Sequence, residues 1–209
     1  GLSLTTGSNN VLIGMKTGTA STTAGSSVAI GSQALVCNIT GNSNTAVGAF
    51  ALCLSTTSGN TAVGSSSLQY QTTGQQNSAL GYATLYCNTL GMQNVAVGYR
   101  AMRENTEGHE NTALGAYALR ENTTATRNTA VGKQALMSNT TGQCNTAVGA
   151  QAMCLNTTGR DNVAVGMNSM LQNTTGCNNT AVGTSVMFSN TTGQNNVAFG
   201  SSALYCTTT

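Results

Sequence analysis

The sequence predicts an all-β fold, a parallel β-solenoid (a β-roll or β-helix) of about twelve coils with 17 residues each. A five-residue phrase recurs at a fixed interval, apolar residues keep fixed places within that interval, and glycine and asparagine recur between the apolar runs. The phrase reads Asn-Thr-Ala-Val-Gly at 145–149, and its glycine recurs twelve times from Gly14 to Gly200. The spacing is 17 residues except for one interval of 16. Such a constant period is typical of stacked repeats.

We number the repeat so that the asparagine of the phrase is position 1 and its glycine is position 5. Positions 1 to 4 carry β-branched and small apolar residues in alternation, which predicts a short strand. Positions 8 to 11 hold a second short run, often beginning Ala-Leu, which we expect to form a second strand. Glycine at position 5 and an Asn-Thr-Thr-Gly turn from position 12 supply the corners, because Gly and Asn accept left-handed backbone.

A single coil cannot be stable alone. Two large apolar side chains contribute about 1.5–3 kcal/mol each on burial, whereas ordering the backbone costs about 1–2 kcal/mol per residue. We therefore expect coils to stack in register about 4.8 Å apart, which gives a rod of about 55–60 Å. Stacking should align Val47, Val63 and Leu80 in one file and let asparagines at positions 1 and 12 exchange hydrogen bonds between coils.

The array is continuous over residues 1–209, so we expect a single domain without a linker. Its first and last residues fall inside a repeat, without the polar caps that soluble solenoids need. From this pattern we expect a part of a longer chain or a subunit of a filament.

The composition excludes several classes of partner. Charged residues make up 6% of the chain, against about 25% in an average domain, so little repulsion opposes association between copies. The net charge of +2 provides no basic patch for nucleic acid. No apolar run approaches the length of about 18 residues that a membrane span requires.

Positions 10 and 11 often carry large apolar groups and in the middle of the chain switch to Arg-Glu pairs. This pattern is compatible with a wide core, or with a lateral interface, since exposed apolar rows mark association sites. The candidate interface residues are Val36, Leu54, Tyr70, Tyr86, Arg103, Glu104, Arg120, Glu121, Leu155, Leu171, Phe188 and Tyr205.

No constellation of residues indicates catalysis, a metal or a cofactor. His109 is the only histidine and lies in a turn. Asp161, the only aspartate, is expected about three coils away, roughly 14 Å at the strand spacing, which is too far for a catalytic pair. The seven cysteines are odd in number and irregular in spacing, so we expect free thiols, with Cys37 and Cys53 the nearest to a pair. We therefore expect no enzyme.

Asparagine sequons recur at position 12. They are a candidate glycan column if the chain passes through a secretory pathway, but Asn-Thr-Thr is also the chemistry of the repeating corner, which we favour. The candidate acceptors are Asn38, Asn122, Asn139, Asn156, Asn173 and Asn190.

The run from Asn128 to Gly142 resembles the head repeats of trimeric autotransporter adhesins (YadA-like), in which a phrase such as Val28–Gly31 recurs. It is more similar still to the 17-residue repeats of fibre-type proteins of bacteria, phages and large viruses. The resemblance implies a left-handed β-roll, an association of three chains, and display outside a cell. The adhesin heads have a shorter repeat than this chain.

We expect a structural fibre protein, a rod that forms an extracellular, cell-surface or virion-surface filament by lateral or end-to-end association with itself, as a homo-oligomer (trimer or filament). The alternative is an adhesin or tail-fibre shaft that binds a cell-surface receptor. A third hypothesis is ice binding by threonine columns at positions 2, 13 and 14.

Overall fold

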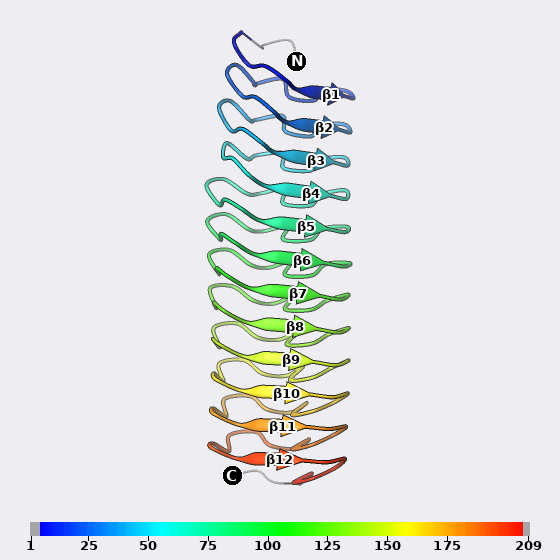
Figure 1. Ribbon diagram of the computed structural model, residues 1–209, viewed down its shortest axis with the longest axis vertical. Helices are drawn as coiled ribbons and strands as arrows, with labels where there is room; N and C mark the ends of the chain where they lie inside the picture. The colour runs from blue at the N-terminus through cyan, green and yellow to red at the C-terminus, as the bar shows by residue number, and fades with distance from the viewer. Residues whose placement is uncertain (1–4, 207–209) are drawn as a thin grey trace.

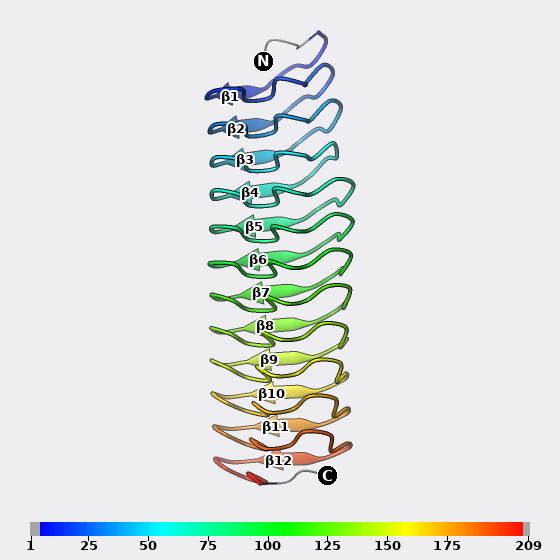
Figure 2. The same ribbon diagram turned by 180° about the vertical axis from the view of Figure 1, so that it is seen from behind.

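The computed structural model describes residues 5–206, which form one tall stack of left-handed coils (Figure 1). In Figure 1 the strands cross the near side from left to right while the chain descends, which is the sense of a left-handed coil. Figure 2 shows the turns that close each coil on the opposite side. The β-solenoid predicted from the repeat is confirmed.

The strands of residues 5–206 form one parallel sheet in sequence order. Each has three residues and pairs in register with the next, so Val47 lies opposite Val63, and Val63 opposite Leu80, as predicted. The strands are β1 (Val11–Ile13), β2 (Val28–Ile30), β3 (Thr45–Val47), β4 (Thr61–Val63), β5 (Ser78–Leu80), β6 (Val95–Val97), β7 (Thr112–Leu114), β8 (Thr129–Val131), β9 (Thr146–Val148), β10 (Val163–Val165), β11 (Thr180–Val182) and β12 (Val197–Phe199).

The second strand predicted at positions 8 to 11 does not form, and this prediction is wrong. Positions 7 and 9 have left-handed backbone, with φ of 61° at Gln134 and 49° at Leu136, which breaks an extended run. The segment instead makes two turns, in which Ala135 N donates to Gly132 O (3.2 Å) and Asn139 N to Leu136 O (3.1 Å). The strain of a left-handed leucine, about 1–2 kcal/mol, is offset because this turn points its side chain into the core.

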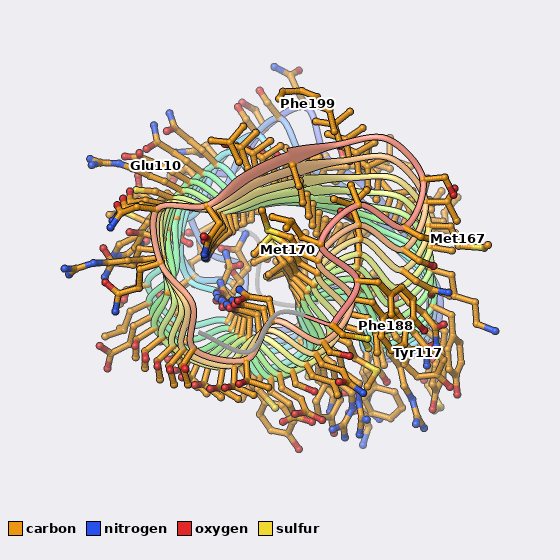
Figure 3. The ribbon with its side chains drawn as sticks, turned by 90° about the horizontal axis from the view of Figure 1, so that it is seen from below. Glu110, Tyr117, Met167, Met170, Phe188 and Phe199 are labelled. Carbon is orange, nitrogen blue, oxygen red and sulfur yellow. The ribbon has the colours of Figure 1, made fainter. Side chains whose placement is uncertain are left out.

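The core is thinner than the sequence suggested. Ala147 at position 3 and Leu136 at position 9 have no exposed surface, whereas Val148 at position 4 is 36% exposed. Most coils therefore bury one large side chain, a Leu or Met at position 9, rather than two. Inside the ring seen in Figure 3, Met170 lies among the other inward-pointing side chains, while Phe199 of β12 points away. Burial alone therefore provides less stability than expected, and bonds between coils must provide more.

Two columns of asparagine amides provide those bonds. At position 1, Asn128 Oδ1 accepts from the backbone N (2.9 Å) and the Nδ2 (3.2 Å) of Asn145. At position 12, Asn139 Oδ1 accepts from Nδ2 of Asn156 (2.8 Å). Nδ2 of Asn145 and of Asn156 both donate to Gly159 O, at 2.8 and 3.0 Å, so one carbonyl joins the columns. We call these the position-1 and position-12 ladders; in both, the donor between coils belongs to the more C-terminal coil.

Glycine at position 5 is required by a close backbone approach. Gly149 has φ of 135°, and a Cβ there would lie 2.5 Å from Gly166 O in the next coil. Position 17 is different: Gly59 has φ of 74°, a Cβ added there would meet no atom closer than 3.9 Å, and other coils carry side chains at this place.

Asn145→Ala should lower the free energy of unfolding by about 2–4 kcal/mol, because the buried N–H of Asn162 loses its acceptor and Gly159 O loses one of two donors. Gln143→Ala removes an exposed side chain from the same turn and should change this energy by less than about 0.5 kcal/mol. Urea denaturation followed by circular dichroism measures both, and equal losses would contradict the role of the ladder.

Gly149→Ala should destabilise the stack by more than about 3 kcal/mol, because both the backbone conformation and the contact with Gly166 O exclude a Cβ. Gly59→Asn should instead raise stability by up to about 1 kcal/mol, since Asn tolerates this φ and restricts the unfolded chain. Thermal melting of the two variants beside the parent chain tests the contrast. Similar melting temperatures for the two variants would show that the close backbone approach at position 5 does not limit the stability of the stack.

Candidate functional site

The strand face, defined as the outward-facing first and third residues of each strand β1–β12, is a continuous uncharged surface. The alternation along a strand puts position 3 inside, so positions 2 and 4 share the outer face. Leu80, Leu114 and Val148 of this face are 49%, 37% and 36% exposed. In-register pairing makes each position a straight file along the rod.

Sequence reasoning missed this face, although a signal for it was present. Position 2 is often Thr or Ser, as at Thr129 and Ser78. A polar residue there favours the outer side of the strand, and the period of two then places position 4 outside as well.

The predicted interface at positions 10 and 11 lies on a different side of the coil from the strand face. Figure 3 shows Phe188 away from Phe199 around the ring. Leu54, Tyr70, Leu155 and Tyr205 are 37% to 42% exposed, and the others of this set are half-buried. The residues pack along the rod, since Tyr70 meets Tyr86 edge-on at 4.9 Å between ring centroids and Phe188 stacks on Tyr205 at 4.9 Å. The side chains at positions 10 and 11 therefore form a row along the rod, and the outer part of this row is exposed to solvent.

The Arg-Glu pairs of this row lie side by side on the surface. Arg103 pairs with Glu104, and Arg120 Nη1 lies 3.6 Å from Glu121 Oε1. Arg103 also lies over the ring of Tyr86, with 5.2 Å from Cζ to the centroid. Ion pairs with this exposure contribute about 0–1 kcal/mol each to the free energy of unfolding, so these pairs add little to the stability of the fold.

A second feature that sequence reasoning missed adjoins this row, and we call it the tyrosine–arginine corner (Tyr82, Tyr99, Arg100, Tyr117 and Arg120). Ring centroids are 5.6 Å apart from Tyr82 to Tyr99 and 5.3 Å from Tyr99 to Tyr117. A pocket of about 340 Å³ at this corner is lined by Arg100, Tyr117, Arg120, Gln134 and Met137. The signal in the sequence is tyrosine at position 6 in two successive coils, next to the densest run of charge.

His109 and Asp161 do not come together in a site. Nδ1 of His109 accepts a hydrogen bond from Met92 N (3.0 Å), which ties its turn to the preceding coil. Asp161 faces Arg160 at 3.8 Å. Residues 5–206 hold no group of three His, Cys, Asp or Glu side chains placed to bind a metal ion.

The seven cysteines, all within the described part of the chain, are free. Burial raises the pKa of the Cys53 and Cys154 thiols above the ordinary value. Burial together with the Glu104 carboxylate, to which Cys87 Sγ donates at 3.5 Å, raises the pKa of Cys87 to about 11. Cys37 lies beside Cys53, with Cys37 N donating to Cys53 O (3.0 Å). The thiols with a raised pKa therefore remain protonated at neutral pH.

The candidate glycan acceptors are buried in the position-12 ladder. All six have 0% or 1% exposure. Nδ2 of Asn139, for example, donates both to Asn122 Oδ1 (3.1 Å) and to Gly142 O (2.9 Å). In the folded chain this nitrogen is hydrogen-bonded and inaccessible to solvent, so the asparagine column holds the corners of the coils together.

The threonines considered for ice binding divide between two places. At position 13, Thr140 Oγ1 donates to Thr157 O (3.1 Å), so its hydroxyl joins coils rather than facing water. At position 2, threonines such as Thr146 lie on the flat strand face, where valine replaces them in several coils.

No protein-family model, curated protein or solved structure matches this chain. Within residues 5–206, no helix has the length and apolar character needed to cross a membrane. Function must therefore be argued from the surfaces of the rod.

At pH 8, iodoacetamide should label the exposed Cys144 well before Cys87, because the raised pKa keeps Cys87 protonated until the pH approaches 11. Glu104→Gln removes a cause of that shift and should accelerate labelling of Cys87 several-fold. Glu121→Gln is the matched control, since Glu121 acts on Cys154 instead. Mass spectrometry of the labelled peptides gives the rates, and equal acceleration of Cys87 by both variants would refute the assignment.

Proposed function

We propose that this chain is a structural protein, a rigid rod that associates side by side with copies of itself to build a fibre or filament. The strand face carries this proposal. It is uncharged throughout the described strands and runs the whole height of the stack in Figure 1. A flat surface of this kind, with apolar and threonine files, marks an association site rather than an ordinary solvated face.

The area of the strand face supports self-association. The twelve strands of the described residues, each three residues long, cover about 55 Å by 10 Å, so two such faces in contact bury about 1,100 Å² in total. That value is near the lower limit of specific interfaces, which bury about 1,200 Å² or more.

The composition and the compact coils support the same role. With 6% charged residues, copies repel one another little. The described residues between the strands are short turns bonded to neighbouring coils, so they offer few of the mobile loop tips at which proteases cut. These properties suit a filament outside a cell or on a virion.

The double variant Val131→Lys with Val148→Lys should remain as single rods under conditions in which the parent chain associates. Both side chains belong to the strand face, so lysine leaves the core intact and adds a row of like charge. Sedimentation velocity and negative-stain electron microscopy distinguish single rods from bundles.

The matched control is Thr141→Lys with Thr158→Lys, at exposed position 14, where another coil already carries Glu107. This control should associate as the parent chain does. Single rods for the parent chain at every concentration, or unchanged bundles for the Val131/Val148 variant, would overturn the proposal.

A further inference from the structure

Charge is concentrated in the middle of this rod, where the proposed packing of strand faces does not use it. Nine of the twelve charged residues lie between positions 100 and 133 of the chain. On the side that carries the tyrosine–arginine corner these are four cations (Arg100, Arg103, Arg120 and Lys133) and two carboxylates (Glu104 and Glu121). A local excess of positive charge on a nearly uncharged rod attracts an anionic partner.

Arg100 and Lys133 hold the part of that charge that no carboxylate compensates. Glu104 and Glu121 pair with Arg103 and Arg120, and no carboxylate of the described residues pairs with Arg100. The guanidinium group of Arg100 has no ion pair within residues 5–206, and that of Arg120 faces Glu121 through Nη1 alone. Both side chains line the pocket of about 340 Å³. Their outer Nη edges fit a carboxylate, which arginine binds in bidentate geometry.

Aromatic rings fix these arginines and add apolar surface beside them. Cζ of Arg100 lies 5.0 Å from the centroid of Tyr99, and that of Arg120 lies 5.9 Å from Tyr117. Tyr82 and Tyr99 are 49% and 41% exposed and extend the row of aromatic side chains along the rod. Figure 3 shows Tyr117 at the outer edge of the coil, pointing into solvent. Exposed tyrosines present an apolar face together with a polar hydroxyl, which favours ligands that have both characters.

Gln134 completes the set of donors in this pocket. Its Oε1 accepts from Nε2 of Gln151 (3.1 Å), which orients the amide. Arginine and glutamine donors beside tyrosine rings match the hydroxyl groups and the C–H face of a sugar ring, and the guanidinium groups match a sugar carboxylate. From this arrangement we propose that the tyrosine–arginine corner binds an acidic saccharide, with a sugar carboxylate between Arg100 and Arg120 and a sugar ring on Tyr117.

An acidic peptide fits this corner less well. Extended peptides gain affinity by pairing with an open strand edge. In these coils the backbone donors are used between coils, for example Gln134 N to Ala116 O (2.9 Å) and Leu136 N to Ala152 O (3.0 Å). The corner therefore offers side-chain donors and rings but no backbone edge.

Isothermal titration calorimetry at low ionic strength tests the proposal with three probes. They are a tetrasaccharide of alternating glucuronate and N-acetylglucosamine, its neutral methyl ester, and a glutamate oligopeptide of equal charge. The acidic tetrasaccharide should bind, and the ester and the peptide should bind at least about tenfold more weakly, which corresponds to the loss of one charge-assisted hydrogen bond or more.

The repeat itself provides substitutions that the fold accepts. Arg100→Gln places at position 7 the residue that Gln134 and Gln151 provide in other coils, and Arg120→Gln places at position 10 the residue found at Gln69. Each should weaken binding of the tetrasaccharide about tenfold with an unchanged circular dichroism spectrum. Arg160→Gln, a distant and exposed cation, should leave binding unchanged.

Three results would overturn the proposal. The first is no binding of the acidic tetrasaccharide to the parent chain. The second is equal binding of the ester or of the glutamate peptide, which would indicate a surface without a carboxylate site or one that prefers acidic protein. The third is equal weakening by Arg160→Gln, which would indicate attraction to net charge alone.

Discussion

The asparagine ladders are the interaction on which the rest of this structure depends. A coil buries little more than one large side chain, which cannot offset the entropy of ordering 17 residues. Each ladder asparagine satisfies buried groups in its own coil and in the next one, as Asn145 does for Gly159 O and for Asn162 N. The amide therefore sets the register between coils and makes the stack, rather than the coil, the unit of stability. Nearest-neighbour stability of this kind is typical of repeat proteins.

The small core and the backbone conformation follow from the same requirement. Coils separated by one strand spacing leave room for alanine at position 3, and Ala147 is completely buried. The position-5 glycines must approach one another closely, as Gly149 and Gly166 do. Large apolar residues that this narrow interior cannot hold, such as Val148, face outward. The uncharged strand face is thus a consequence of the thin interior, and the association that we propose would use a surface that the fold already requires.

The sequence predicted the stack, the register and the ladders because each depends on a residue type that returns at a fixed interval. It did not predict the turns at positions 7 to 9, since nothing in Leu136 as a residue type indicates left-handed backbone; the neighbouring coil imposes it. It also overestimated the core at two large buried side chains per coil, because an apolar residue such as Val148 is compatible with either side of a strand. Of the candidate surfaces, the row containing Tyr70 and Phe188 was visible as a pattern. The tyrosine–arginine corner joins residues at different repeat positions, such as Arg100 and Arg120, which only the coil geometry brings together.

The common direction of the ladder donors has an electrical consequence. The side-chain carbonyls of Asn128, Asn145 and Asn162 each point towards the following coil, so their dipoles add along the rod instead of cancelling. The inter-coil backbone bonds run in both directions, as Thr146 N to Asn162 O and Gly149 N to Val131 O illustrate, so they do not share the single direction of the ladders. The ladders themselves are therefore polar along the axis, with their positive end towards the N-terminal coils. Between two rods that lie side by side, the interaction of these ladder dipoles is more favourable when the rods are antiparallel.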